Sequence, residues 1–256
     1  SFLDVLRAAA GWEDEVVLSL TDGATEDFPE SFVFVDPVDP SRNVAAAVSP
    51  EKRRLFMQAA VAYLEKPRLS FFFPRPVEPW LLEEIQPRLE SWISVVLPRP
   101  DVVDDILYSQ VRKALRNLST VLEEHDFVCL DSTYHVDGEV LLAVQLEQRE
   151  LSEEKMHLGP PVEQEEHAAA FLEKWEEHPR TIARPSVEDG RWQVTITRRY
   201  RSARELLQEC LDEVNLGKHL SRQAADARVL AGAELAREKY AVFWTEQLSD
   251  KMPWER

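Results

Sequence analysis

Residues 92–133 decide the fold; they read WISVVLPRPDVVDDILYSQVRKALRNLSTVLEEHDFVCLDST. The largely apolar run 92–97 is typical of a buried strand, and the prolines at positions 98 and 100 end it. Over 102–124 apolar residues recur at helical spacing, which predicts the longest helix of the chain. A second apolar strand is expected over 127–133. The stretch therefore predicts a strand, a helix and a strand in that order.

Further elements continue this order toward the C-terminus. We expect strands over 139–148, 182–186 and 192–198, and a helix over 164–177. Residues 155–161 contain Gly159 followed by two prolines and are predicted to form a stiff loop. Helical stretches are expected over 203–214 and 221–248. The strand–helix–strand–strand–helix–strand order over 92–198 predicts an α+β sandwich of the RNA-recognition or ferredoxin-like kind.

The residues before Pro67 predict a separate domain. A helix over 2–10, strands over 16–20 and 32–35, and a helix that starts after Ser49 and runs to about Lys66 are expected. Pro67 is the predicted boundary, so the domains are 1–67 and 68–256. Beyond it we expect a strand over 69–73 and a short helix over 80–89.

The charge is strongly acidic: 47 acidic and 30 basic residues give a net charge of −17, and of the basic residues 22 are Arg and 8 are Lys. Acidic residues spread over the whole chain, with Arg in place of Lys, predict a protein adapted to molar salt. Charge alone argues against nucleic acid as a partner, but at ~1 M salt the Debye length is only ~3 Å and this argument weakens. Two cysteines and no apolar run of ~20 residues predict a cytoplasmic protein without membrane attachment.

The sharpest local motif is Asp36-Pro-Val-Asp39-Pro-Ser-Arg42-Asn43, directly after a predicted strand. Two carboxylates beside a guanidinium could bind a metal or a nucleotide. Alternatively, Asp36 and Asp39 cap turns and Arg42 pairs with one of them. The local pattern leaves both interpretations open.

Basic residues form small groups in the C-terminal half. Lys155 and His157 lie in the predicted stiff loop, which could present a donor or simply connect two elements. Arg198, Arg199 and Arg201 surround a tyrosine, and further on come Lys218 and Arg222. Arg and Tyr together can hold phosphates and stack on bases, or the arginines can be neutralised by neighbouring Glu. The six histidines show no metal-ligand spacing.

Several phrases resemble one family, the archaeal (class I) CCA-adding enzymes. They are DPVDPSRNVAAA at 36–47, PRPDVVDDILYSQVRK at 98–113 and HLGPP at 157–161, with GRW at 190–192 and PWER at 253–256. This family adds C, C and A to the 3′ end of tRNA from CTP and ATP. The resemblance implies an α+β fold made of the remainder of a central α/β domain and an RNA-recognition or ferredoxin-like domain with helical additions.

The resemblance also implies roles for individual residues. Arg42 would contact the incoming nucleotide, with Asp36 and Asn43 supporting its loop. The tRNA acceptor stem and T-arm would be held by Lys155, His157, Arg198, Arg199, Arg201, Lys218 and Arg222. The family's catalytic head carries a Gly-Ser turn and an Asp-x-Asp pair that hold two Mg²⁺ ions. The sequence contains no Asp-x-Asp pair, so we expect a chain that begins inside the central domain, with no catalytic residue or metal ligand of its own.

Two other functions remain open from the sequence. One is a stand-alone module that holds structured RNA without catalysis, and the other is an acidic protein–protein interaction domain. The residues also leave open whether the protein forms a homodimer.

Overall fold

The computed structural model describes residues 1–12, 16–19, 28, 30, 32–46 and 48–256. It divides into two compact units. The first unit is Ser1–Glu78 together with Ser249–Arg256, and the second is Pro79–Leu248.

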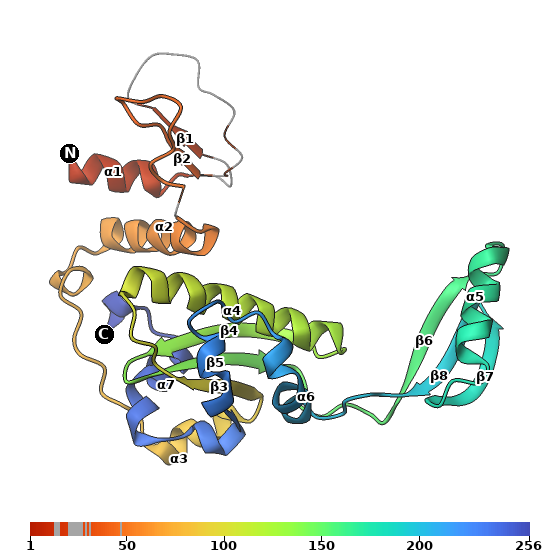
Figure 1. The fold of residues 1–256 in the computed structure, drawn as a ribbon. Coiled ribbons are helices and arrows are strands. Elements are labelled where there is room, and N and C mark those ends of the chain that lie inside the picture. The colour runs from red at the N-terminus through yellow and green to blue at the C-terminus, as the bar shows by residue number, and fades with distance from the viewer. Residues whose placement is uncertain (13–15, 20–27, 29, 31, 47) are drawn as a thin grey trace. The chain divides into compact units, whose positions relative to one another are not determined.

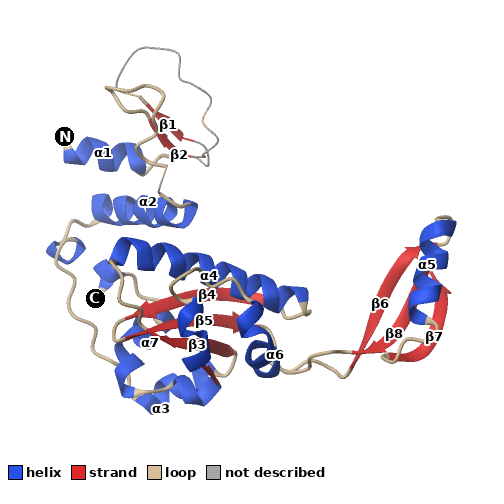
Figure 2. Ribbon diagram, viewed as in Figure 1, coloured by secondary structure: helices blue, strands red, loops and turns tan. Residues whose placement is uncertain are grey.

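The second unit is built on a four-stranded antiparallel sheet with the strand order β4-β5-β3-β9 (Figure 2). The strands are β3 (Trp92–Pro98), β4 (Cys129–Val136), β5 (Glu139–Leu146) and β9 (Arg228–Ala231). Helix α4 (Asp104–Glu124) follows β3, and α6 (Ala203–Cys210) precedes β9. This βαββαβ arrangement has the strand order of a ferredoxin-like sheet and confirms the α+β fold class.

Both faces of this sheet are covered. On one face Ile93, Val95 and Leu97 pack in one cluster with residues of α4 and α6. On the other face Trp92 and Val96 pack with residues of α3 (Leu82–Ile85) and α7 (Ala241–Leu248). A strand buried on both sides needs apolar residues at successive positions, which explains why Ser94 is the one polar residue between Trp92 and Leu97.

A second, three-stranded sheet is inserted between β5 and α6 (Figure 1). Its strands are β6 (Glu154–Pro161), β7 (Thr181–Glu188) and β8 (Arg191–Thr197), in the order β6-β8-β7. Helix α5 (Glu165–Trp175) packs Phe171 and Trp175 onto the central strand β8. We call residues 154–197 the arm. The chain enters and leaves it side by side, because the Leu151 amide donates to the Arg201 carbonyl at 2.8 Å.

The arm corrects the predicted extent of the sandwich. The elements expected over 164–177, 182–186 and 192–198 exist, but they belong to the arm. The four-stranded sheet is instead completed by β9, which lies inside the stretch 221–248 that was expected to be helical. Residues 155–161, expected to be a loop, lie in strand β6.

The first unit consists of α1 (Phe2–Ala9), α2 (Pro50–Glu65) and a parallel pair of short strands, β1 (Val16–Leu18) and β2 (Phe32–Phe34). The side chain of Ser49 caps α2 by accepting from the Lys52 amide at 3.3 Å, as expected for the Ser-Pro start. The predicted strand over 69–73 is wrong. This segment forms a 3₁₀ turn, and Phe71 stacks on Trp254 with the ring centroids 5.7 Å apart.

The remaining short elements are 3₁₀ turns: η1 (Leu69–Phe71), η2 (Gln86–Leu89), η3 (Leu211–Glu213), η4 (Ser221–Asp226), η5 (Gly232–Leu235), η6 (Glu238–Tyr240) and η7 (Pro253–Glu255). Within the described part of the chain, no helix combines the length and the apolar character that crossing a membrane requires.

Candidate functional site

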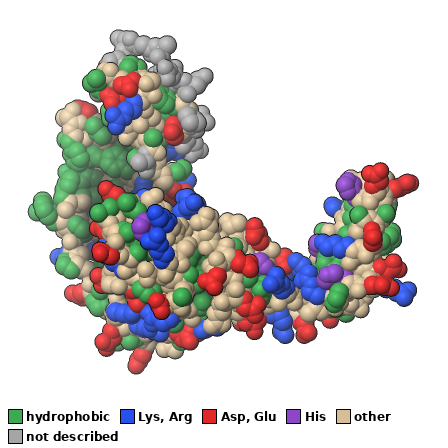
Figure 3. Space-filling view, in the orientation of Figure 1, with side chains coloured by type: hydrophobic (Ala, Val, Ile, Leu, Met, Phe, Trp, Pro, Cys, Tyr) green, Lys and Arg blue, Asp and Glu red, His purple; other side chains and the backbone are tan. Residues whose placement is uncertain are grey.

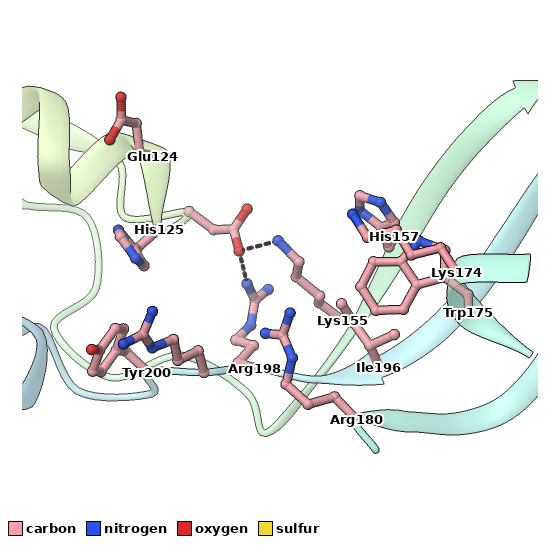
Figure 4. Close-up of a pocket in the computed structure, with 12 residues that line it drawn as sticks. Glu124, His125, Lys155, His157, Lys174, Trp175, Arg180, Ile196, Arg198 and Tyr200 are labelled. Carbon is pink, nitrogen blue, oxygen red and sulfur yellow. Dashed lines mark hydrogen bonds and ion pairs between the residues drawn. The ribbon is translucent and has the colours of Figure 1, made fainter. Parts of the chain in front are cut away.

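A pocket of about 350 Å³ lies where the C-terminal end of α4 meets the base of the arm (Figure 4). Its lining holds two carboxylates, Glu124 and Asp126, and two imidazoles, His125 and His157. The lining also holds five Lys and Arg side chains: Lys155, Lys174, Arg180, Arg198 and Arg199. In a chain with a net charge of −17, such a surplus of positive charge is a local exception. Figure 3 shows Lys and Arg side chains gathered with His at this junction.

Strand pairing brings two of the cations together. Lys155 lies near the start of β6, and Arg198 directly follows β8, the strand that pairs with β6. Both side chains reach one oxygen of Asp126: the Lys155 ammonium donates at 2.6 Å, and the Arg198 guanidinium also donates to it. Asp126 thus joins the end of α4 to β6 and to the residue that directly follows β8.

The other three cations lie against aromatic rings. Lys174 and Arg180 lie 5.0 and 5.9 Å from the ring centroid of Trp175, and Arg199 lies 5.0 Å from that of Tyr200. None of the three forms an ion pair with a residue in the described part of the chain. Their positive charge is therefore not neutralised by a neighbouring carboxylate and is available to an incoming anion.

Two donors in the pocket lining have no partner among the described residues. They are Nε of Arg198 and Nε1 of Trp175, and both atoms are buried. Burial, together with the charges of Lys155, Lys174 and Arg180, lowers the pKa of His157 below its usual value, although Asp126 acts in the opposite direction. Burial contributes most to this lowering, and the positive potential of the three cations adds to it. The unpaired cations and this potential suit an anionic ligand.

The structure brings together four of the seven residues predicted to hold RNA: Lys155, His157, Arg198 and Arg199. Arg201 lies outside the pocket and pairs with Glu153 at 3.7 Å. Lys218 and Arg222 are exposed and also lie outside it.

Sequence reasoning missed Lys174, Arg180 and Asp126. Lys174 and Arg180 are single basic residues among glutamates, and only the pairing of the arm places them beside the predicted group. The adjacency of Lys174 to Trp175 was the one available signal, because cations often lie over tryptophan.

The loop after β2 carries the second predicted group, and Asn43 organises it. Its side-chain oxygen accepts from the amides of Phe34 and Ala45, both at 2.9 Å. Its amide nitrogen donates to the Phe32 carbonyl at 3.1 Å. One side chain therefore satisfies backbone groups on both sides of the loop and fixes its course.

Asp36 and Arg42 lie on the same loop. Asp36 accepts from the Val38 amide at 2.9 Å and lies 3.8 Å from the Arg42 guanidinium. Hydrogen bonds from the hydroxyl and amide of Ser41 lower the pKa of Asp39. The turn-capping geometry considered from the sequence is therefore present. The Arg42 side chain nevertheless stays 69% exposed, so its guanidinium can still meet a ligand.

Across the described residues, no three or more His, Cys, Asp or Glu side chains are grouped so that they could hold a metal ion. Asp36 and Asp39 are used by their own turns, as described above, and do not form a metal site.

The fold and the pocket define the class of protein first: an α+β protein with a cationic pocket at the base of its arm. Comparison with known proteins narrows this class. Residues 88–232 match the family described as "CCA-adding enzyme, C-terminal domain", and residues 1–73 match "tRNA nucleotidyltransferase, second domain". The chain belongs to the CCA-adding enzyme family.

Individual relatives agree with this assignment. A CCA-adding enzyme of Methanosarcina acetivorans is 34% identical over 93% of this chain and 54% of the relative. That of Methanosarcina mazei is 33% identical over the same shares, and that of Methanoregula boonei is 30% identical over 100% of this chain and 56% of the relative. The chain spans about half the length of the curated relatives it matches.

Proposed function

We propose that this chain is the tRNA-holding part of a CCA-adding tRNA nucleotidyltransferase, which adds C, C and A to the tRNA 3′ end from CTP and ATP. In this proposal residues 1–67 contribute part of the nucleotide site, and residues 68–256 hold the acceptor stem and T-arm. Membership of the CCA-adding enzyme family supports it.

The observation that carries the proposal is the cationic pocket at the base of the arm. RNA helices are recognised mainly through their shape, phosphates and 2′-hydroxyls, and an enzyme that accepts every tRNA needs this kind of contact. Cations without carboxylate partners, beside the rings of Trp175 and Tyr200, supply phosphate contacts in an otherwise acidic chain. Arg201, Lys218 and Arg222 would extend this contact outside the pocket.

We assign nucleotide binding to Arg42, supported by its exposed guanidinium and by a loop that Asn43 and Asp36 hold in place. A guanidinium can donate to acceptors on cytosine or on adenine, which suits a site that changes nucleotide. The family also implies Mg²⁺. The described residues do not fit a metal site, so we assign this chain no metal ligand and derive no catalytic step through the ion.

The test is RNA binding by the full chain, measured by fluorescence anisotropy with a labelled minihelix of acceptor stem and T-arm. The double variant Arg180→Gln/Arg199→Gln removes two cations that have no carboxylate partner among the described residues, so no charge is orphaned. We expect roughly tenfold weaker binding. The slope of log K against log salt should also become shallower by about one to two units, since each lost phosphate contact removes ~0.7–0.9.

Arg42→Ala is the control in the same assay. This substitution also removes a cation, but we assign Arg42 to the nucleotide site. RNA affinity should therefore stay unchanged, while the whole enzyme should require a higher concentration of CTP. If the double variant binds RNA as tightly as the original chain, the pocket does not hold RNA.

A further inference from the structure

Asp126, which lines the pocket, has an unusual backbone. It follows α4 with φ of 73°, in the left-handed region. Its amide donates to the Glu123 carbonyl at 3.0 Å, and the next amide, of Phe127, donates to the Leu122 carbonyl at 3.1 Å. These two bonds form a Schellman motif, in which the left-handed position is usually Gly and sometimes Asn. The backbone alone would therefore favour glycine here.

An aspartate at this position is explained by its carboxylate rather than by its backbone. That carboxylate accepts from Lys155 and from Arg198, whose side chains are only 25% and 16% exposed. It stands where a phosphate oxygen would stand if the same two cations held RNA. In the free protein the Asp126 carboxylate therefore occupies the position that a phosphate would take between Lys155 and Arg198.

The remaining polar groups do not need Asp126 and are not satisfied by it. Nε of Arg198 stays without a partner among the described residues although its guanidinium already pairs with Asp126. Arg180 and Arg199 form no ion pair with a described residue. A phosphodiester could pair with Arg180 and Arg199 as well as use the two donors that Asp126 occupies, so it has more partners to gain than the carboxylate has.

We propose that Asp126 is an internal competitor for RNA: its carboxylate mimics a backbone phosphate in the free protein, and RNA displaces it from Lys155 and Arg198. This inference rests on the proposed function and adds a regulatory contact to it. Displacement separates the end of α4 from Lys155 of the arm and from Arg198, which directly follows the arm. RNA binding therefore exchanges one anion, the carboxylate, for another, the phosphate. The competitor lowers the affinity of the site for RNA, because the RNA must displace the carboxylate before it can pair with these two cations.

The decisive variant is Asp126→Asn in the full chain, tested with the labelled minihelix over 0.1–0.5 M KCl. Asparagine keeps the shape of the side chain and tolerates a left-handed backbone, so the Schellman motif is preserved. Asp126→Gly, the residue that the motif favours, is the second variant in case the first is poorly folded. We expect both to bind RNA roughly three- to tenfold more tightly. The salt slope should steepen by about one unit, because each variant removes one negative charge and so leaves the site with one more uncompensated positive charge for phosphate.

Asp104→Asn is the matched control. Asp104 begins the same helix, which has 21 residues and so spans ~31 Å, and it pairs with Arg99 at 2.7 Å. The control makes the same chemical change and the same change in net charge far from the pocket. RNA affinity and salt slope should not change.

Each result decides between stated alternatives. If Asp126→Asn and Asp126→Gly bind RNA equally or less tightly, while Arg180→Gln/Arg199→Gln still weakens binding, the carboxylate only positions the cations; the inference is then wrong and the proposed function stands. If the chain and all variants fail to bind RNA, both are wrong. If the Asp126 variants tighten binding of CTP but not of the minihelix, the phosphate comes from a free triphosphate, and the assignment to RNA is wrong.

Discussion

At the scale of single residues, Gly159 shows how closely the arm is packed. It lies in β6, and a Cβ at this position would come within 2.8 Å of the Phe171 ring on α5. Its carbonyl also accepts two hydrogen bonds from the Arg191 guanidinium, at 3.1 and 2.9 Å. The absence of a side chain therefore lets helix and strand approach each other.

Gly159→Ala should destabilise the arm by about 1–3 kcal/mol, because a ring in a small packed cluster cannot move aside without loss of contacts. Urea unfolding followed by tryptophan fluorescence measures this change. Gly138→Ala is the control, since a Cβ there meets nothing within 4 Å. An equal effect of the two substitutions would show that the contact with Phe171 is unimportant.

The candidate site shows how far single residues could be predicted. The sequence identified Lys155, His157, Arg198 and Arg199 as two separate groups of basic residues. It could not unite them, because their proximity depends on the antiparallel pairing of β6 with β8. Asp126 could not be recognised at all, since its role comes from a left-handed backbone and from partners far away in the chain.

At the scale of elements, the errors have a common physical cause. Strand β6 was not predicted, because Pro160 and Pro161 usually indicate a loop. It lies at the edge of its sheet, where a missing amide is tolerated. Strand β9 has only 4 residues, and its partner is the buried strand β3. By contrast β3 and α4 were predicted well, because their own patterns of apolar residues match their surroundings.

Glu139 joins three of these elements. At the first position of β5, it accepts from Arg228 of β9 at 2.7 Å and from Lys239 and Tyr240 of η6. Burial acts to raise the pKa of this carboxyl, but the hydrogen bonds from Lys239 and Tyr240 outweigh it, and the pKa is lowered from its usual 4.5.

Because the pKa of Glu139 is lowered on folding, the free energy of unfolding depends on pH in a predictable direction. The unfolded chain takes up a proton at Glu139 near pH 4.5, whereas the folded chain takes up this proton only at lower pH. The stabilisation is therefore complete above that pH and is lost as the pH falls through the folded pKa. Glu139→Gln should be less stable than the original chain at pH 7, and the difference should shrink toward pH 3.5. Urea midpoints at both pH values measure it.

Glu154→Gln provides the comparison for this experiment. Glu154 is also the first residue of a strand, but it is exposed and forms no ion pair with a described residue. Its substitution should change the midpoint little at either pH. A difference for Glu139→Gln that is the same at pH 7 and pH 3.5 would contradict the assigned role.

At the scale of the whole molecule, the net charge of −17 acts on stability through self-repulsion. The Debye length falls from ~30 Å at 0.01 M salt to ~3 Å at 1 M, so added salt screens this repulsion. We therefore expect the urea midpoint to rise with KCl over this range at pH 7.5. Near the sequence pI of 4.8 the same salt series should have a much smaller effect. Equal rises at both pH values would point to a salt effect unrelated to net charge.

The way the arm leaves the four-stranded sheet has a consequence for design. Glu150 and Ser202 form a bridge, so the two points where the arm begins and ends are neighbours across a pair of antiparallel chains. A short turn could join them, and neither the strand order nor the two covered faces of the main sheet would change. Because the arm and the four-stranded sheet have separate hydrophobic clusters, we expect that the length and sequence of the arm can be changed while the sheet keeps its own core.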